Sequence, residues 1–211
     1  MKTRNKAITK DVQNTFTPSG VLNDLLEGNN RFANDEIQNV DNSALIEQTI
    51  NSQFPKAVIL SCIDSRVPVE TIFDQAIGDV FVARVAGNFE NTDILGSLEY
   101  SCKVAGSKLV LVLGHESCGA VKAACDGVEL GNITAMLDNI LPAIKMSSDE
   151  VDGELNSSNK EFVNKTIENN VKLTIRRIRE KSPILKEMED NEDIKIVGGI
   201  YSLSTGKVEM L

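Results

Sequence analysis

Short apolar runs alternate with helical patterns along most of the chain. Four of these runs are rich in leucine and β-branched residues and lack strict alternation with polar residues, which is typical of strands buried on both faces of a sheet. They lie at 57–61, 80–85, 109–113 and 194–200. Because helical segments separate them, they predict a single α/β domain with a mainly parallel central sheet of four strands, flanked by helices.

Helical periodicity is clearest over 160–181. Its apolar residues recur three or four positions apart, as on one face of a helix: Val163, Ile167, Val171, Ile175 and Ile178. Pro183 is expected to end this helix. Shorter helices are expected at 68–74, 94–105 and 119–125.

Two amphipathic helices are expected before the first strand. The second lies at 44–50, and the first has the following apolar residues: Val21, Leu22, Leu25, Leu26 and Phe32. Both are expected to pack against a partner subunit. Residues 1–20 form a polar N-terminal segment, and 21–211 are expected to form the single domain.

Two further segments have loop or turn composition. The stretch 147–159 is polar, acidic and weakly patterned, which predicts an exposed loop between helices. Residues 204–207, in the sequence STGK, separate two apolar segments and predict a hairpin turn. The turn adds a short antiparallel edge strand to the sheet.

Composition and charge narrow the class of function. Of the 211 residues, 41% are hydrophobic and 25% are charged, and the formal net charge is −9. The lysines and arginines are scattered, so neither nucleic acid nor a membrane is an expected partner, and a small-molecule substrate fits better. No apolar run approaches the ~20 residues that span a bilayer, and no signal peptide is visible. A cytoplasmic location is expected unless a presequence was removed.

Four cysteines are too few and too unevenly spaced for a disulfide framework in a domain of this size. In a reducing compartment they serve as buried thiols, nucleophiles or metal ligands. Cys102 and Cys125 lie within helical patterns and are expected to be inert core thiols.

The remaining chemistry-bearing residues stand at the ends of predicted strands. Cys62, Asp64 and Arg66 follow the first strand, and His115 and Cys118 follow the third. A parallel sheet brings such ends together, and ligands bind in the crevice beyond them. Two thiolates and one imidazole suit Zn²⁺ and leave a fourth position for water. The same residues also suit a metal-free thiol enzyme with a cysteine nucleophile and His115 as its base, so both hypotheses stay open at this point.

Four sequence motifs of the chain are similar to those of a known family. CIDSRVPVE, GDVFVARVAGN, LGSLEY and VLGHESCGAV occur here in the order and approximate spacing of the β-class carbonic anhydrases, which this chain resembles. The similarity extends from about Leu25 to the terminal TGKVEML.

The resemblance implies a catalytic zinc held by Cys62, His115 and Cys118. It also implies that Arg66 holds Asp64 near the metal, where Asp64 could become a fourth ligand in a closed state. The implied reaction is the reversible hydration of carbon dioxide to bicarbonate and a proton, through zinc-bound hydroxide. The implied assembly is a homodimer, or a homotetramer built from dimers, with a pocket lined across the dimer interface.

The substrate pocket is predicted from the plant-like subgroup of the family, which has a glutamine, a phenylalanine and a tyrosine at fixed offsets from the metal ligands. The expected pocket residues are Gln53, Phe81, Val85, Ala86, Gly87 and Tyr100. A second subgroup has a regulatory bicarbonate site that includes a tryptophan. This chain has no tryptophan, so that inhibition is not expected. Hydrolysis of carbon disulfide or carbonyl sulfide, and a non-enzymatic zinc protein on the same scaffold, remain alternatives.

Overall fold

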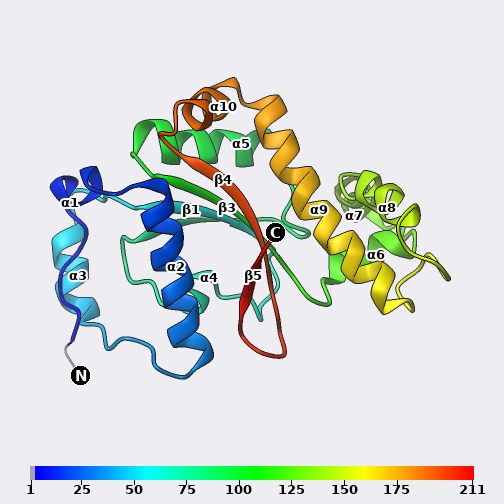
Figure 1. Cartoon of the computed structure of the whole chain (residues 1–211), viewed down its shortest axis with the longest axis horizontal. Coiled ribbons are helices and arrows are strands. Elements are labelled where there is room, and N and C mark those ends of the chain that lie inside the picture. The colour runs from blue at the N-terminus through cyan, green and yellow to red at the C-terminus, as the bar shows by residue number, and fades with distance from the viewer. Residues whose placement is uncertain (1–2) are drawn as a thin grey trace.

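The computed structural model describes residues 3–211 and contains one five-stranded sheet (Figure 1). The strands are β1 (Ala57–Ser61), β2 (Val80–Arg84), β3 (Leu109–His115), β4 (Lys195–Tyr201) and β5 (Val208–Met210). Their order is β2-β1-β3-β4-β5, with β1 to β4 parallel and β5 antiparallel to β4. The predicted α/β fold with an antiparallel edge strand is confirmed.

Helices cover both faces of this sheet. They are α1 (Lys10–Asn14), α2 (Pro18–Ala33), α3 (Asn42–Thr49), α4 (Val69–Ile72), α5 (Thr92–Glu99), α6 (Gly119–Cys125), α7 (Gly131–Leu137), α8 (Leu141–Ser148), α9 (Lys160–Lys181) and α10 (Pro183–Asp190). Figure 1 shows α6, α7 and α8 beside α9, at the opposite end of the molecule from α1 and α3. No helix in the described part of the chain is long and apolar enough to cross a membrane.

Successive strand residues enter opposite cores because side chains alternate across a sheet. Ile59 and Leu111 pack with α2 and α4, whereas Val58 and Val110 pack with α5, α9 and α10. Strands β1 and β3 are buried throughout, as predicted. Strand β2 differs from the prediction: it lies at the edge of the sheet, so its residues are half-buried or exposed.

The N-terminal residues pack on their own chain. Val21 and Leu25 of α2 are buried in the core under the sheet. Within the segment predicted to be polar, the buried Gln13 donates its amide to the carbonyl oxygens of Pro55 and Ala105, at 2.9 and 2.8 Å. Packing of these helices against a partner stays a prediction.

The helices differ from the predictions in two places. Pro183 does not only end α9: it is the first residue of α10, where a fixed φ favours the start of a helix, and Ser182 caps it by accepting from the Leu185 N–H. Helices α7 and α8 were not predicted, and the loop predicted from residue 147 begins only after α8 ends at Ser148.

The helix predicted at 94–105 has two parts. After α5, the chain continues as one turn of π-helix, η1 (Tyr100–Val104). The wider turn is closed by the Ala105 N–H donating to the Tyr100 carbonyl oxygen at 2.9 Å. Such turns often occur at functional sites, and this one includes a predicted pocket residue, Tyr100.

Candidate metal centre

Two neighbouring strands deliver three metal-binding side chains to the carboxyl edge of the sheet. Cys62 follows β1, His115 is the last residue of β3, and Cys118 caps the start of α6. One ligand atom from each residue lies within 4.8 Å of the others, and the two sulfurs are 3.9 Å apart. All three residues are buried, with exposed fractions of 4% or less.

This geometry fits a tetrahedral zinc. Two sulfurs at the usual Zn–S distance of about 2.3 Å would lie roughly 3.8 Å apart in a tetrahedral site, close to the observed 3.9 Å. The Nδ1 atom of His115 lies 2.9 Å from the Glu116 carbonyl oxygen. Because a carbonyl oxygen only accepts, Nδ1 holds the proton and the lone pair is on Nε2.

The Nε2 atom of His115 is the clearest sign of a ligand. It is buried and has no hydrogen-bond partner among the residues that the structure describes. A buried polar atom without a partner costs about 1 to 3 kcal/mol. Coordination of a metal ion would remove this cost, and the backbone bond on Nδ1 is the usual way to orient a ligating imidazole.

The two thiols shift each other's pKa. The hydrogen bond from Cys118 is the main cause that lowers the pKa of Cys62 below its usual range, and His115 and the Gly87 N–H add to this effect. The bond to Cys62 and burial raise the pKa of Cys118, because a second thiolate would face the first. A divalent cation between the sulfurs would stabilise both thiolates.

Arg66 holds the Asp64 carboxylate beside the three ligands. Its Nε donates to Oδ1 at 3.0 Å and its Nη2 to Oδ2 at 2.8 Å, while its backbone N–H also donates to Oδ1 at 2.9 Å. These bonds keep the pKa of Asp64 below its usual range. Oδ2 lies 3.9 Å from His115 Nε2, so the carboxylate borders the metal position without bonding the imidazole.

Arg84 secures the loop that contains Cys62 and Asp64. It ends β2 and pairs in register with Ser61. Its Nε donates to the Cys62 carbonyl oxygen at 2.9 Å and its Nη2 to the Asp64 carbonyl oxygen at 2.7 Å. This role was not predicted from the sequence, although a charged residue at the end of a strand beside β1 was a usable signal.

Gly87 approaches the centre through its backbone. Its N–H donates to the Cys62 sulfur at 3.4 Å. Its φ is +84°, and a Cβ there would lie 2.7 Å from Ile140 Cδ1. The positive φ favours glycine, and a larger residue would also force the end of the Ile140 side chain to shift. The adjacent Val85 and Ala86 are half-buried.

The other predicted pocket residues lie along the β2 edge. Phe81 and Tyr100 pack edge to face, with ring centroids 6.2 Å apart, beside a cavity of about 720 Å³. Gln53 precedes β1 and lines a separate cavity of about 340 Å³ that includes Ile77. Within one chain, Gln53 therefore lies at the end of β1 opposite Cys62. Substrate binding by these residues stays a prediction.

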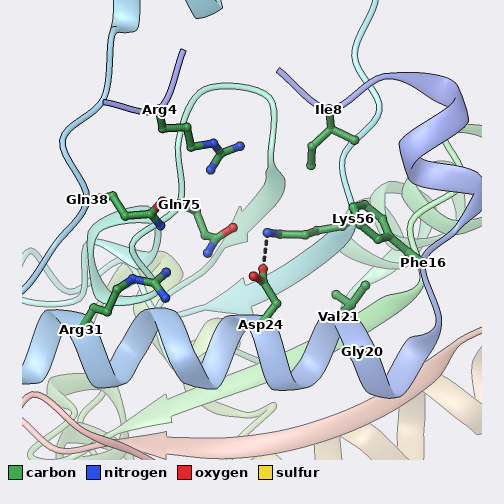
Figure 2. A pocket seen from close by; sticks show the side chains of 10 residues that line it. All are labelled: Arg4, Ile8, Phe16, Gly20, Val21, Asp24, Arg31, Gln38, Lys56 and Gln75. Atoms are coloured by element: carbon green, nitrogen blue, oxygen red, sulfur yellow. Dashed lines mark hydrogen bonds and ion pairs between the residues drawn. The ribbon is translucent and has the colours of Figure 1, made fainter. Parts of the chain in front are cut away.

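A cavity of about 330 Å³ lies at the amino end of the sheet (Figure 2). The Lys56 ammonium, just before β1, pairs there with Asp24, as the dashed line in Figure 2 marks. Two more cations at this cavity are paired: Arg4 binds Asp79 with both terminal nitrogens at 2.5 and 2.6 Å, and Arg31 binds Asp74 at 2.6 Å. This end of the sheet has matched charges, and no group of potential metal ligands occurs there among residues 3–211.

The predicted metal-site residues therefore converge, together with Gly87. A buried Cys/His/Cys set at the carboxyl edge of a parallel sheet defines an α/β protein with a candidate catalytic metal centre. Residues 57–208 match the family model described as carbonic anhydrase. The chain belongs to this family, in its β class.

Individual relatives agree with this assignment. The chain is 33% identical to carbonic anhydrase 2 of Mycobacterium tuberculosis over 192 residues, which cover 87% of each protein. The structure of a Coccomyxa β-carbonic anhydrase in complex with acetazolamide matches with a TM-score of 0.71 and 26% identity, over 90% of this chain and 86% of that one. One of two tetrameric β-carbonic anhydrases of Sordaria macrospora matches in fold, with a TM-score of 0.68 and 23% identity, over 90% of this chain and 96% of that one.

Proposed function

We propose that this chain is a zinc-dependent carbonic anhydrase that interconverts carbon dioxide and bicarbonate, with zinc on Cys62, His115 and Cys118. The enzyme class, carbonate dehydratase, follows from the family. The observation that carries the zinc assignment is His115 Nε2, which is buried beside two sulfurs without a partner among the described residues. Bound zinc would lower the pKa of a water molecule from 15.7 toward about 7 and so supply the nucleophile.

Asp64 and Arg66 keep the fourth position open. Both carboxylate oxygens of Asp64 are engaged by Arg66, so Asp64 does not turn toward the ligands. Oδ2 remains close enough to the centre to accept a hydrogen bond from the attacking water and orient its lone pair. The pair acts as one unit, because a bidentate arginine fixes the plane of the carboxylate.

Release of the product proton is unusual in this chain. His115 is the only histidine in the sequence, and it is a proposed ligand. No imidazole is left to transfer protons, so they must leave through solvent, buffer, or groups such as Tyr100. We expect kcat to rise several-fold with the concentration of an imidazole buffer at fixed pH and ionic strength, and a constant kcat would contradict this step.

The position of Gln53 is explained by a homodimer. The β2 edge is unpaired within the described chain and half-exposed, and Gln53, Phe81 and Tyr100 lie along it. A two-fold axis that pairs two β2 edges reverses the strand direction. It places Gln53 near the partner's Cys62, where the amide could donate to a substrate oxygen.

An apolar slot for carbon dioxide would complete this shared pocket. Phe81, Tyr100 and the chain at Val85 and Ala86 provide apolar surface, which suits a substrate without a net dipole. A homotetramer of such dimers is compatible with the tetrameric relatives from Sordaria macrospora. The cytoplasmic location stays a prediction.

Metal removal tests the proposed function. Carbon dioxide hydration is measured by stopped flow on protein with a known zinc content, before and after dialysis against a zinc chelator, and again after zinc is added back. We expect about one zinc per chain, loss of activity with the metal, and recovery on addition. Equal activity with and without zinc would reject the proposal, and a zinc protein inactive toward carbon dioxide would favour the binding-protein alternative.

A further inference from the structure

A polar residue of α9 connects to the centre through the backbone of a single residue, Gly87. Asn170 is 1% exposed, and its Nδ2 donates to the Gly87 carbonyl oxygen at 2.7 Å. The N–H of the same residue, Gly87, donates to the Cys62 sulfur at 3.4 Å. The three residues come from α9, the segment after β2 and the segment after β1, so the connection exists only in the folded protein.

The Gly87 turn is held by hydrogen bonds on two sides. Gly87 and Asn88 have positive φ angles of +84° and +44°, a left-handed conformation that glycine adopts freely and asparagine more readily than most residues. The Asn88 N–H donates to the Val85 carbonyl oxygen at 2.9 Å and closes the turn on one side. The Asn170 amide binds the Gly87 carbonyl and thereby restricts rotation of the Gly87 backbone.

The buried position of Asn170 lowers the stability of the fold. It lies on the buried side of α9, between the core residues Ile167 and Val171. Its Oδ1 is buried and has no hydrogen-bond partner in the described chain. An apolar residue would avoid that cost, so the single bond from Nδ2 to Gly87 is what the asparagine provides here.

We propose that Asn170 is a positioning residue of the metal centre, which aims the Gly87 N–H at the Cys62 sulfur and so tunes this thiolate as a ligand. The inference deepens the proposed function and rests on its zinc site. An N–H bond to a ligating sulfur withdraws charge from it and fixes its direction, and such outer contacts adjust metal affinity and electronic structure.

The neighbouring Asn169 is a matched control. It is also a buried asparagine of α9, 2% exposed, but its Nδ2 donates to Ser147 Oγ at 3.0 Å and Glu150 Oε1 at 3.1 Å. Asn169→Ala removes an equivalent buried amide from the same helix without affecting the Gly87 turn. It therefore reports the effect of destabilising α9 alone.

The test compares Asn170→Ala, Asn170→Asp and Asn169→Ala with the wild type. Zinc affinity is measured by competition with a chromophoric chelator, and the sulfur-to-cobalt charge-transfer band is recorded on the Co²⁺-substituted proteins. Both Asn170 variants should bind zinc about 10- to 100-fold more weakly. Their band should shift to longer wavelength, because the sulfur loses a donor. Asn169→Ala should stay within about two-fold in affinity and keep the wild-type band.

Two outcomes overturn the inference: Asn170 variants with the affinity and spectrum of the wild type, or Asn169→Ala with the same changes as Asn170→Ala. If Asn170→Ala does not fold, the test uses Asn170→Asp, because aspartate has nearly the same volume as asparagine and lacks the Nδ2 donor. A wild type that binds no zinc rejects the proposed function itself. A wild type that binds zinc beside unchanged Asn170 variants rejects only this inference.

Discussion

The two ends of the sheet both hold polar side chains that are at least partly buried, but these side chains are paired in different ways. At the amino end, three cations each face a carboxylate: Arg4 with Asp79, Arg31 with Asp74, and Lys56 with Asp24. At the carboxyl end, two thiols contact each other and His115 Nε2 has no partner among the described residues. Charges that satisfy one another stabilise the fold, whereas a buried polar atom such as His115 Nε2 that lacks a partner indicates an absent ligand.

The largest loss of activity is expected when Cys62 is replaced. Cys62→Ser replaces a thiolate with a weak ligand, so zinc should be lost and kcat/KM should fall by at least about 1,000-fold, because the metal supplies the nucleophile. Zinc content and stopped-flow hydration check this. Cys102→Ser is the control: Cys102 is a buried core thiol whose pKa burial raises to about 12. That variant should keep zinc and activity and lose about 1 to 3 kcal/mol of unfolding free energy.

The next largest loss of activity is expected when Arg66 is replaced. Arg66→Ala frees Asp64, which can then turn toward the ligands or lose its alignment, so kcat/KM should fall about 100-fold with zinc retained. Arg66 is largely exposed, so the free energy of unfolding should change little. Kinetics and urea unfolding of the same preparation separate the two effects. A fully active variant would contradict the role of this pair.

Arg4 is the matched arginine at the opposite end, also bidentate to an aspartate. Arg4→Ala leaves the fully buried Asp79 carboxylate with the backbone N–H of Ala76 as its only donor among the described residues. The unfolding free energy should fall by about 2 kcal/mol, between the values for exposed and buried pairs. Hydration activity should stay within about two-fold per zinc. If Arg4→Ala lost as much activity as Arg66→Ala, the amino end of the sheet would not be purely structural, and the contrast between the two ends would be wrong.

The smallest effect is expected at Lys56. Its partner Asp24 is about half-exposed, so Lys56→Met leaves a carboxylate that water can solvate. The change in unfolding free energy should stay below about 1 kcal/mol, and activity should not change. Denaturant unfolding and hydration assays measure both. A large loss of activity would show that the cavity in Figure 2 takes part in catalysis.

The sequence predicted the sheet from local patterns, whereas residue spacing left a metal site and a thiol enzyme both open, and the set of metal ligands followed from the four family motifs. The runs at β1 and β3 are continuous, and Cys62 and His115 stand where these strands end. Asp64 and Arg66 are two residues apart, so their pairing needs no long-range information.

The contacts that sequence reasoning missed are set by tertiary packing. Nothing local shows that Asn170 faces the Gly87 carbonyl rather than solvent, although a polar residue on the apolar side of α9 was a weak signal. Pro183 was ambiguous because proline both ends one helix and begins the next. Gln53 cannot be assigned from one chain, since its proposed place is at the site of a partner.

Zinc-edge X-ray absorption of the purified protein identifies the metal ligands directly. We expect two sulfurs at about 2.3 Å from the zinc, with one nitrogen and one further light atom at about 2.0 to 2.1 Å. In Cys62→Ser protein reloaded with zinc, one sulfur should be lost. A wild-type shell without sulfur, or protein that holds no zinc, would contradict the assignment of Cys62, His115 and Cys118 as the metal ligands.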